Sequence, residues 1–324
     1  MKRRHLLTTL VAASLFTSLP TIVHANTNYP NKPVRLVVPF APGGTTDTVA
    51  RRVAQELTNL WGQTVIIENK PGAGTTIGVN TVAKAAPDGY TLGAVTASFT
   101  VNPALLPSLP YDTKKDLRAV ALMADSDHVL VVNTTVPANT VDELLALIKS
   151  KPGELTFASF GNGSNSHLSG ERLALHAGVP MIHVPYKGQS PAMLDVIAGR
   201  VQMMFASLPE ATPHLQAGKL KVLGTAATKR SVFAPDVPTL AELGVPGIIS
   251  SSWNGLIAPA GTPDEIVNKI NADVNKVLAL PAVKEAFANV GIAVTPGSAE
   301  DFAKFLDSQM ELYGDIVRKA NIKL

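Results

Sequence analysis

The sequence predicts an α/β fold with two lobes, each built on a doubly wound sheet. Short β-branched runs alternate with segments whose apolar residues recur at helical spacing, and each run ends in small or polar residues. This alternation restarts near residue 155, after an irregular stretch, and the chain finishes in a helical tail. A second α/β unit is therefore expected to be inserted into the first.

Composition agrees with this class. The 324 residues are 46% hydrophobic but only 5% aromatic, which suits an α/β core rich in Ala, Val and Leu. Because cysteine is absent, disulfides, thiolate metal sites, cysteine nucleophiles and a lipidated cysteine are excluded.

The first 25 residues have the pattern of a secretory signal peptide. Lys2, Arg3 and Arg4 precede an apolar run over 6–19, and Val23-His24-Ala25 favours cleavage after Ala25. A membrane anchor is the alternative, but the run is short and rich in Ser and Thr. The mature protein is expected in the periplasm.

Removing this segment also changes the charge balance. It holds three of the 28 Lys and Arg residues and none of the 25 Asp and Glu residues, so the remainder has 25 of each. We find no basic stripe with interleaved aromatic residues and expect no nucleic-acid partner.

The first unit begins with a strand at 34–38, followed by a turn at 39–47 and a helix to about Trp61. A helix through Lys84 follows the second strand, and 102–116 reads as irregular. Further strands of this part are expected at 64–68, 91–95 and 119–123.

The second unit is expected to repeat the alternation. A helix is predicted at 142–149, and others follow the loops at 160–167 and 185–190. Its strands are expected at 129–132, 155–159, 181–184, 201–205 and 221–225. A short helix is predicted at 240–243.

The tail returns to the first unit. An extended segment at 252–258 precedes helices at 263–278, 281–290 and 299–319, with a brief strand at 292–294. The chain is expected to cross between the lobes near 120–130 and near 248–256. These crossings predict a signal peptide at 1–25, a first domain of 26–124 plus 251–324 and a second domain of 125–250.

Pro39 to Asp47 is the turn on which the functional interpretation rests. Gly43 and Gly44 lie where a strand ends and a helix begins, so no Cβ atom keeps a ligand from the first helical amides. Thr45 or Thr46 is predicted to cap the helix, and Asp47 to order the loop. Two interpretations remain open here: a cradle for a carboxylate or phosphate, and a capped turn without a ligand.

Two further glycine-rich loops, at 69–76 and 160–167, also open helices. If two lobes face each other, all three loops converge on one cleft, where backbone amides would hold an acid. His167 either contacts the ligand or packs and caps locally. Lys187 either meets a carboxylate or lies solvated, and Tyr186 either lines the cleft or belongs to the core.

Enzyme motifs match poorly. The glycines at 72–78 have the wrong spacing for a dinucleotide fingerprint, and no phosphate loop is present. Residues 188–192 lack the last glycine of a nucleophile elbow. The histidines show no metal spacing with carboxylates. We expect no catalytic residue, metal or cofactor; a hydrolase using Ser164 or Ser190 is the remote alternative.

The same residues carry a family pattern over essentially the whole mature chain. The chain resembles the periplasmic solute receptors of tripartite tricarboxylate transporters, the Bug-type receptors. The segments that carry this resemblance are 29–35, 38–44 with Asp47, 68–74, 86–92, 102–103, 184–188, 218–220, 235–239, and Trp253 with 258–263.

The resemblance implies a Venus flytrap (periplasmic binding protein, type II-like) that closes on a small carboxylate and delivers it to a two-component membrane permease. A monomer is expected, and a sensor feeding a membrane signalling protein is the alternative. Family members often carry an acid near the end of the strand at 203–207, where this chain has Ala206 and Ser207. We therefore expect a plain carboxylate rather than an amino acid.

The loops and the resemblance together give the ligand-binding candidates. They are Phe40, Ala41, Gly43, Gly44, Thr45, Gly74, Thr75, Ser98, Ser159, Gly161, Gly163, Ser164, His167, Tyr186, Lys187, Gly188, Ala206 and Ser207.

Overall fold

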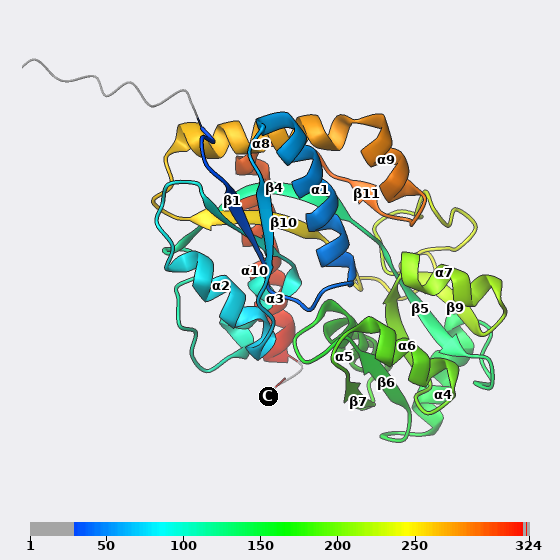
Figure 1. Ribbon diagram of the computed structural model, residues 1–324. Helices are drawn as coiled ribbons and strands as arrows, with labels where there is room; N and C mark the ends of the chain where they lie inside the picture. Colours follow the sequence, from blue (N-terminus) through cyan, green and yellow to red (C-terminus); the bar gives the residue numbers. More distant parts are fainter. Residues whose placement is uncertain (1–28, 320–321, 323–324) are drawn as a thin grey trace, which may run out of the picture.

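Two separate sheets define two lobes in the computed structural model, which describes residues 29–319 and 322 (Figure 1). The predicted signal peptide lies outside the described residues. The first sheet has six strands in the order β11-β4-β10-β3-β1-β2, and the second has five in the order β7-β6-β8-β5-β9. The two-lobed α/β fold predicted from the sequence is therefore confirmed.

The first lobe is assembled from both ends of the described chain. Its strands are β1 (Val34–Val38), β2 (Val65–Asn69), β3 (Thr91–Val95), β4 (Leu117–Asp125), β10 (Asn254–Pro259) and β11 (Ala293–Val294). Its helices are α1 (Thr45–Trp61), a 3-10 turn η1 (Ala73–Thr75), α2 (Thr76–Ala83), α3 (Ala97–Leu105), α8 (Asp264–Ala279), α9 (Pro281–Ala288) and α10 (Ala299–Lys319).

The second lobe is one continuous segment. Its strands are β5 (His128–Asn133), β6 (Thr156–Ser159), β7 (Ile182–Pro185), β8 (Met203–Ser207) and β9 (Leu220–Thr225). Its helices are α4 (Val141–Ser150), α5 (Asn165–Ala177), α6 (Gln189–Ile197) and α7 (Leu208–Gln216).

Both sheets mix parallel and antiparallel strands, and in the first sheet the edge strand β11 is also antiparallel to its neighbour β4. In the first lobe β1, β2 and β3 run parallel, whereas β10 is antiparallel to β3 and β4. In the second lobe β6, β7 and β8 run parallel, whereas β5 is antiparallel to β8 and β9. In each lobe the antiparallel strand inside the sheet, β10 or β5, is the one that enters directly after the chain crosses over, so insertion of the second lobe explains its reversal.

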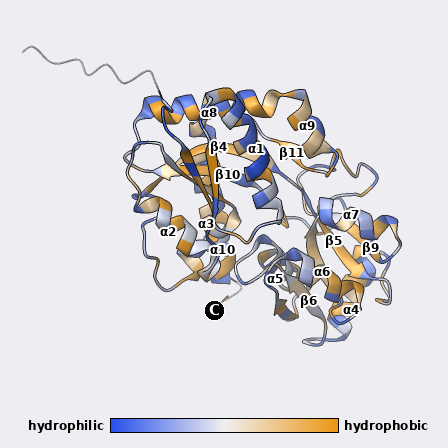
Figure 2. Ribbon diagram, viewed as in Figure 1, coloured by the Kyte–Doolittle hydropathy of each residue, from blue (hydrophilic) through white to orange (hydrophobic). Residues whose placement is uncertain are grey.

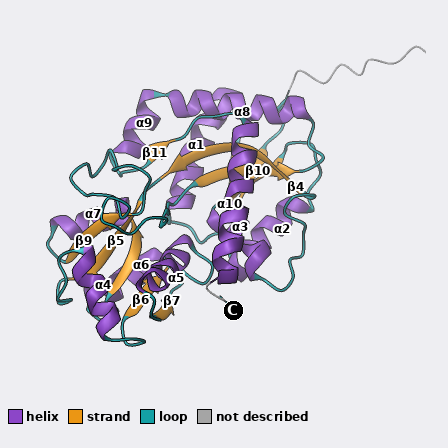
Figure 3. Ribbon diagram, turned by 180° about the vertical axis from the view of Figure 1, so that it is seen from behind, coloured by secondary structure: helices purple, strands orange, loops and turns teal. Residues whose placement is uncertain are grey.

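Helices cover both faces of each sheet, so the inner strands are largely buried and mostly apolar, whereas the edge strands β2 and β7 are more open (Figures 2 and 3). Helix α1 shows how the sequence determines such a covering helix, through one apolar face and a glycine after its last residue. Val49, Val53 and Leu57 form its buried face, and the helix ends at Gly62, which takes a left-handed φ of 64°.

Two local expectations were wrong, and one helix was not expected. Residues 97–105 form α3 despite Pro103, because Phe99, Val101 and Leu105 are buried in the packing against α10. Helix α7 was not predicted; Pro209 in its first turn is compatible with a helix start. The expected helix at 240–243 is a pair of hydrogen-bonded turns, which stop at Gly244 with φ 80°.

The two crossings lie side by side as a short antiparallel ribbon. Asp127 and Ser251 form a bridge, and the Ser252 amide donates to the Ser126 carbonyl at 2.8 Å. His128 is fully buried between two serines, with Nδ1 2.8 Å from the Ser250 Oγ and Nε2 2.8 Å from the Ser252 Oγ. Burial lowers the pKa of His128 to about 3.

Within the described chain, no helix combines the length and apolarity that crossing a bilayer requires.

This ribbon predicts acid sensitivity of the fold. The unfolded chain binds the His128 proton near pH 6.5 and the folded chain only near pH 3. The contribution of neutral His128 to the free energy of unfolding is therefore intact above pH 6.5. It is lost as the pH falls from 6.5 toward 3, and the loss from pH 7 to pH 5 is about 2 kcal/mol. We expect urea unfolding of His128→Leu to give a lower free energy at pH 7 and a smaller fall to pH 5 than in the unmodified protein. Equal falls in both proteins would contradict this assignment.

Candidate functional site

The first loop is held by the buried carboxylate of Asp47. This group accepts hydrogen bonds from the Gly43 amide at 2.9 Å, from Arg51 Nε at 2.8 Å and from Asn69 Nδ2 at 2.8 Å. The Asn69 amide also reaches the Phe40 carbonyl, so one network joins the end of β1 to the start of α1. The expectation that Asp47 orders the loop is confirmed.

Burial alone would raise the pKa of Asp47. The hydrogen bonds from Arg51, Asn69 and Gly43 outweigh burial and hold its pKa below the usual value. The carboxylate therefore stays charged at neutral pH, and its charge is taken up by the loop itself.

The expected threonine cap is wrong. Gly44 occupies the N-cap position of α1, and neither threonine side chain closes the helix, because Asp47 reaches back to the Gly43 amide instead. The amides of Thr45 and Thr46 lie in the first helical turn, where no intrahelical acceptor exists. A Cβ atom added at Gly44, whose φ is −82°, would meet no atom within 4 Å.

The second loop has a strained backbone. Gly72, Ala73, Gly74 and Thr75 all have positive φ, between 45° and 127°, and two of them carry side chains. Thr75 is 7% exposed and its Oγ1 has no hydrogen-bond partner. Strain and an unpaired buried hydroxyl in one loop are typical of functional sites.

The loop's partner in the first lobe is α3. Asn102 Nδ2 donates to the Gly74 carbonyl at 2.8 Å, and Ser98 lies half-buried in the first turn of this helix.

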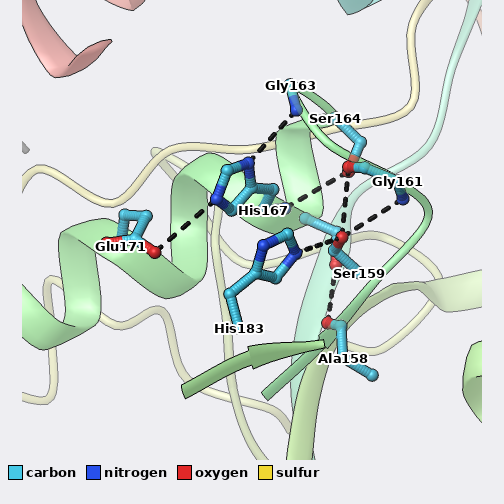
Figure 4. A network of polar contacts seen from close by, with 9 residues as sticks. Ala158, Ser159, Gly161, Gly163, Ser164, His167, Glu171 and His183 are labelled. Atoms are coloured by element: carbon cyan, nitrogen blue, oxygen red, sulfur yellow. Dashed lines mark hydrogen bonds and ion pairs between the residues drawn. The ribbon is translucent and has the colours of Figure 1, made fainter. Parts of the chain in front are cut away.

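The third loop is closed by reciprocal hydrogen bonds (Figure 4). Ser164, the N-cap of α5, accepts from the His167 amide, and His167 Nδ1 accepts from the Gly163 amide at 3.1 Å. This arrangement is a variant of the capping box, in which histidine replaces the usual Glu or Gln and accepts from the amide of the residue before the N-cap. Ser159 Oγ accepts from the Gly161 amide at 3.1 Å, so each glycine of the loop has a side-chain partner.

His167 is stacked on His183 with ring centroids 3.7 Å apart. Because Nδ1 of His167 must accept from Gly163, its proton belongs on Nε2, which lies 3.6 Å from Glu171. The pKa of His183 is lowered to about 3, mainly because the side chain is buried and to a smaller extent because His167 lies beside it. Of the two interpretations of His167, the structure favours local capping, since the side chain is nearly buried and its ring nitrogens face Gly163 and Glu171.

Two of the loops touch the opposite lobe. A Cβ on Gly163 would lie 2.5 Å from the Leu105 side chain of α3, and Leu168 of α5 joins the core cluster of the first lobe. From the other side, Thr45 Oγ1 donates to Glu210 Oε1 of α7 at 3.1 Å. In Figure 1 the N-terminal end of α1 is the end that lies nearer the second lobe. The loops at 39–47 and 160–167 therefore both lie at the boundary between the lobes, the first against α7 and the second against α3.

The remaining candidates are placed less directly. Tyr186 is half-buried and donates to Asp195 at 2.6 Å, Lys187 is exposed, and the Gly188 amide donates to the Phe160 carbonyl. Ser207 is almost fully buried, and Gln189 bonds both its hydroxyl and its amide. Phe40 is half-buried, Ala41 is exposed and Ala206 is buried in the core.

Glu210 is the residue that the sequence analysis missed. It belongs to a pocket of about 480 Å³ between the lobes, to which the first loop and α1 contribute Gly43, Gly44, Thr45 and Thr48. The other lining residues are Ser190, Met193, Leu194, Pro209, His214, Val290 and Ile292. The absence of an acid at 206–207 was read correctly, but an acid three residues further along faces the same region. Helix α7 was not expected, so nothing placed Glu210 there.

Chemistry beyond binding has little support in these side chains. The Ser159 Oγ lies 2.6 Å from His183 Nε2, but Ser159 is fully buried, so a substrate carbonyl could not reach it. Ser164 is engaged as a cap and donates to the Gly161 carbonyl. Among the residues described, no group of three or more His, Cys, Asp and Glu side chains could hold a metal ion.

Two α/β lobes joined by paired crossings, with a pocket between them, define a two-lobed solute-binding protein. A model of the tripartite tricarboxylate transporter family receptor matches residues 49–322, and the chain belongs to this family. Protein BugT of Bordetella pertussis is 37% identical over 298 residues, 91% of each chain. These findings confirm the resemblance to Bug-type receptors.

Solved structures agree. A protein of R. palustris solved with adipate has a TM-score of 0.83 at 33% identity, over 91% of this chain and 99% of that one. MatC from Rhodopseudomonas palustris with bound malate has a TM-score of 0.81 at 35% identity, over 89% of this chain and 100% of that one.

The third loop gives a prediction that needs no ligand. In His167→Gln the side-chain oxygen can still accept the Gly163 amide, whereas His167→Leu has no acceptor. Both variants lose the stacking on His183, so this loss cancels in the comparison. We expect the Gly163 amide to exchange hydrogen at least tenfold faster in the Leu variant than in the Gln variant, as about 1.4 kcal/mol of lost protection would give. Equal exchange in the two would mean that His167 does not hold the loop.

Proposed function

We propose that this protein is a periplasmic receptor that binds a small carboxylate between its lobes and delivers it to a tripartite tricarboxylate-type permease. The observation that carries the proposal is the start of α1. Its first-turn amides have no intrahelical acceptor, the space beside Gly44 is open, and both belong to the pocket between the lobes. Relatives solved with adipate and malate support a carboxylate.

The mode of action follows from the hinge and the loops. Contacts such as Thr45–Glu210 and Gly163–Leu105 cross between lobes and break when the lobes separate, whereas the ribbon at 126–128 and 250–252 holds the lobes together. A ligand that bonds to loops of both lobes would favour the closed form, which the permease would recognise. This function needs no catalytic group.

Several further expectations belong to this proposal. The signal peptide is cleaved after Ala25, and the mature protein acts as a monomer in the periplasm without a cofactor. The domain boundaries fall in the hinge ribbon, so that one domain comprises 26–124 plus 251–324 and the other 125–250. The candidate residues of the three loops, His167 excepted, contact the ligand, partly through water.

A thermal-shift screen tests the proposal. The purified mature chain is heated with mono-, di- and tricarboxylates, with sugars as controls, and an acid present well above its dissociation constant raises the midpoint. We expect Gly44→Val to keep its own melting temperature within a few degrees but to lose the shift, because the new side chain fills the open space beside the amides. Gly43 is the poorer test, since its φ of 91° makes any side chain strained.

Stabilisation of Gly44→Val by the same acid, to the same extent, would exclude α1 as the anion site. The screen is repeated after unfolding and refolding, which removes any ligand that co-purified. Failure of every acid to stabilise this refolded protein would contradict the carboxylate assignment itself.

A further inference from the structure

Glu210 is turned into the pocket by its neighbours. It is the third residue of α7, the position from which an acid commonly reaches back to the N-cap amide. Here the Ser207 amide already donates to Gln189 Oε1 at 2.9 Å. The Glu210 carboxylate is thereby free to extend toward the other lobe, where Thr45 Oγ1 donates to it at 3.1 Å.

The charge of Glu210 is not balanced by a nearby cation. No Lys or Arg in the part of the chain that the structure describes forms an ion pair with it, and none lines the pocket. Burial raises the pKa of Glu210, against the opposing hydrogen bonds from Thr45 and Gln189. The other titratable lining group is His214, one turn further along the same helix.

Most of the rest of the pocket wall is apolar, apart from Thr48, Ser190 and His214. Met193, Pro209 and Ile292 line it, together with two side chains that are unusually open: Leu194 is 62% exposed and Val290 is 47% exposed. Covering such side chains is favourable in proportion to the apolar area removed from water. One end of the pocket therefore offers the amides of α1, and the remainder offers an apolar surface.

These features limit the charge of the ligand. One carboxylate is offset by the first-turn amides and the dipole of α1. A second carboxylate finds no Lys or Arg in the pocket and lies near the negative charge of Glu210.

We propose, on the basis of the proposed function, that Glu210 makes this receptor select carboxylates that carry one negative charge and an apolar body, and disfavours dicarboxylates. Such a preference distinguishes this receptor from the two relatives solved with adipate and with malate, because both of those ligands are dicarboxylates. Glu210 is thus a specificity-determining residue placed opposite the anion cradle.

Matched pairs of acids test this selection. Butyrate and succinate, hexanoate and adipate, and benzoate and terephthalate differ within each pair by one carboxylate. Dissociation constants are measured by calorimetry at pH 7.5 for the unmodified protein, for Glu210→Gln, and for Glu285→Gln as a control. Glu285 is an exposed residue of α9 outside the pocket, so this control removes the same charge elsewhere.

We expect the unmodified protein to bind the monocarboxylate of the best pair at least tenfold tighter than its dicarboxylate. Glu210→Gln should reduce this ratio at least tenfold by strengthening dicarboxylate binding, and Glu285→Gln should leave it within twofold. An unmodified protein that prefers dicarboxylates would overturn the proposal, whether or not the variant folds. An unchanged ratio in a folded Glu210→Gln would overturn the role of Glu210. If no member of any pair binds any of the three proteins, and a wider acid panel also fails, it is the proposed function that fails.

Discussion

The arrangement of the site depends on one buried carboxylate. Asp47 binds the Gly43 amide, Arg51 and Asn69, and so fixes the turn between β1 and α1. Because the acid comes from within the helix, the N-cap can be glycine, and the space beside the first amides stays open. A serine or threonine cap would satisfy the same helix end but would place its own oxygen on those amides. Asp47 therefore stabilises the turn without blocking it.

The second lobe uses a comparable device with different residues. In its loop at 160–167, Ser159 and His167 accept hydrogen bonds from the amides of Gly161 and Gly163, and Ser164 donates to the Gly161 carbonyl. The two loops face opposite lobes, and His128 ties the crossings together behind them. Loops fixed by their own side chains on separate lobes, with two paired crossings between the lobes, are what the proposed capture by closure requires.

Much of this could be predicted from the sequence, for physical reasons. The alternation of apolar runs with helical segments predicts the two lobes, and glycines directly after a strand predict the loop of Gly43 and Gly44. Both signals are local in the sequence. The helices α3 and α7 and the role of Glu210 depend on contacts between distant residues. The threonine cap of α1 was predicted wrongly for a local reason, because Asp47 accepts from the Gly43 amide instead. Asp47 was assigned correctly because its position in the first turn already implies a bond to nearby amides. Glu210 could have been found only by recognising that Gln189 takes over the cap of α7.

The most direct measurement is amide NMR of the isotope-labelled mature protein, titrated with the carboxylate that stabilises it most. The account predicts that the largest shifts fall on Thr45 and Thr46 in one lobe and on 161–164 in the other, and that both groups titrate with one dissociation constant. Shifts confined to one lobe, or centred on residues outside these loops, would contradict binding between the lobes at the start of α1.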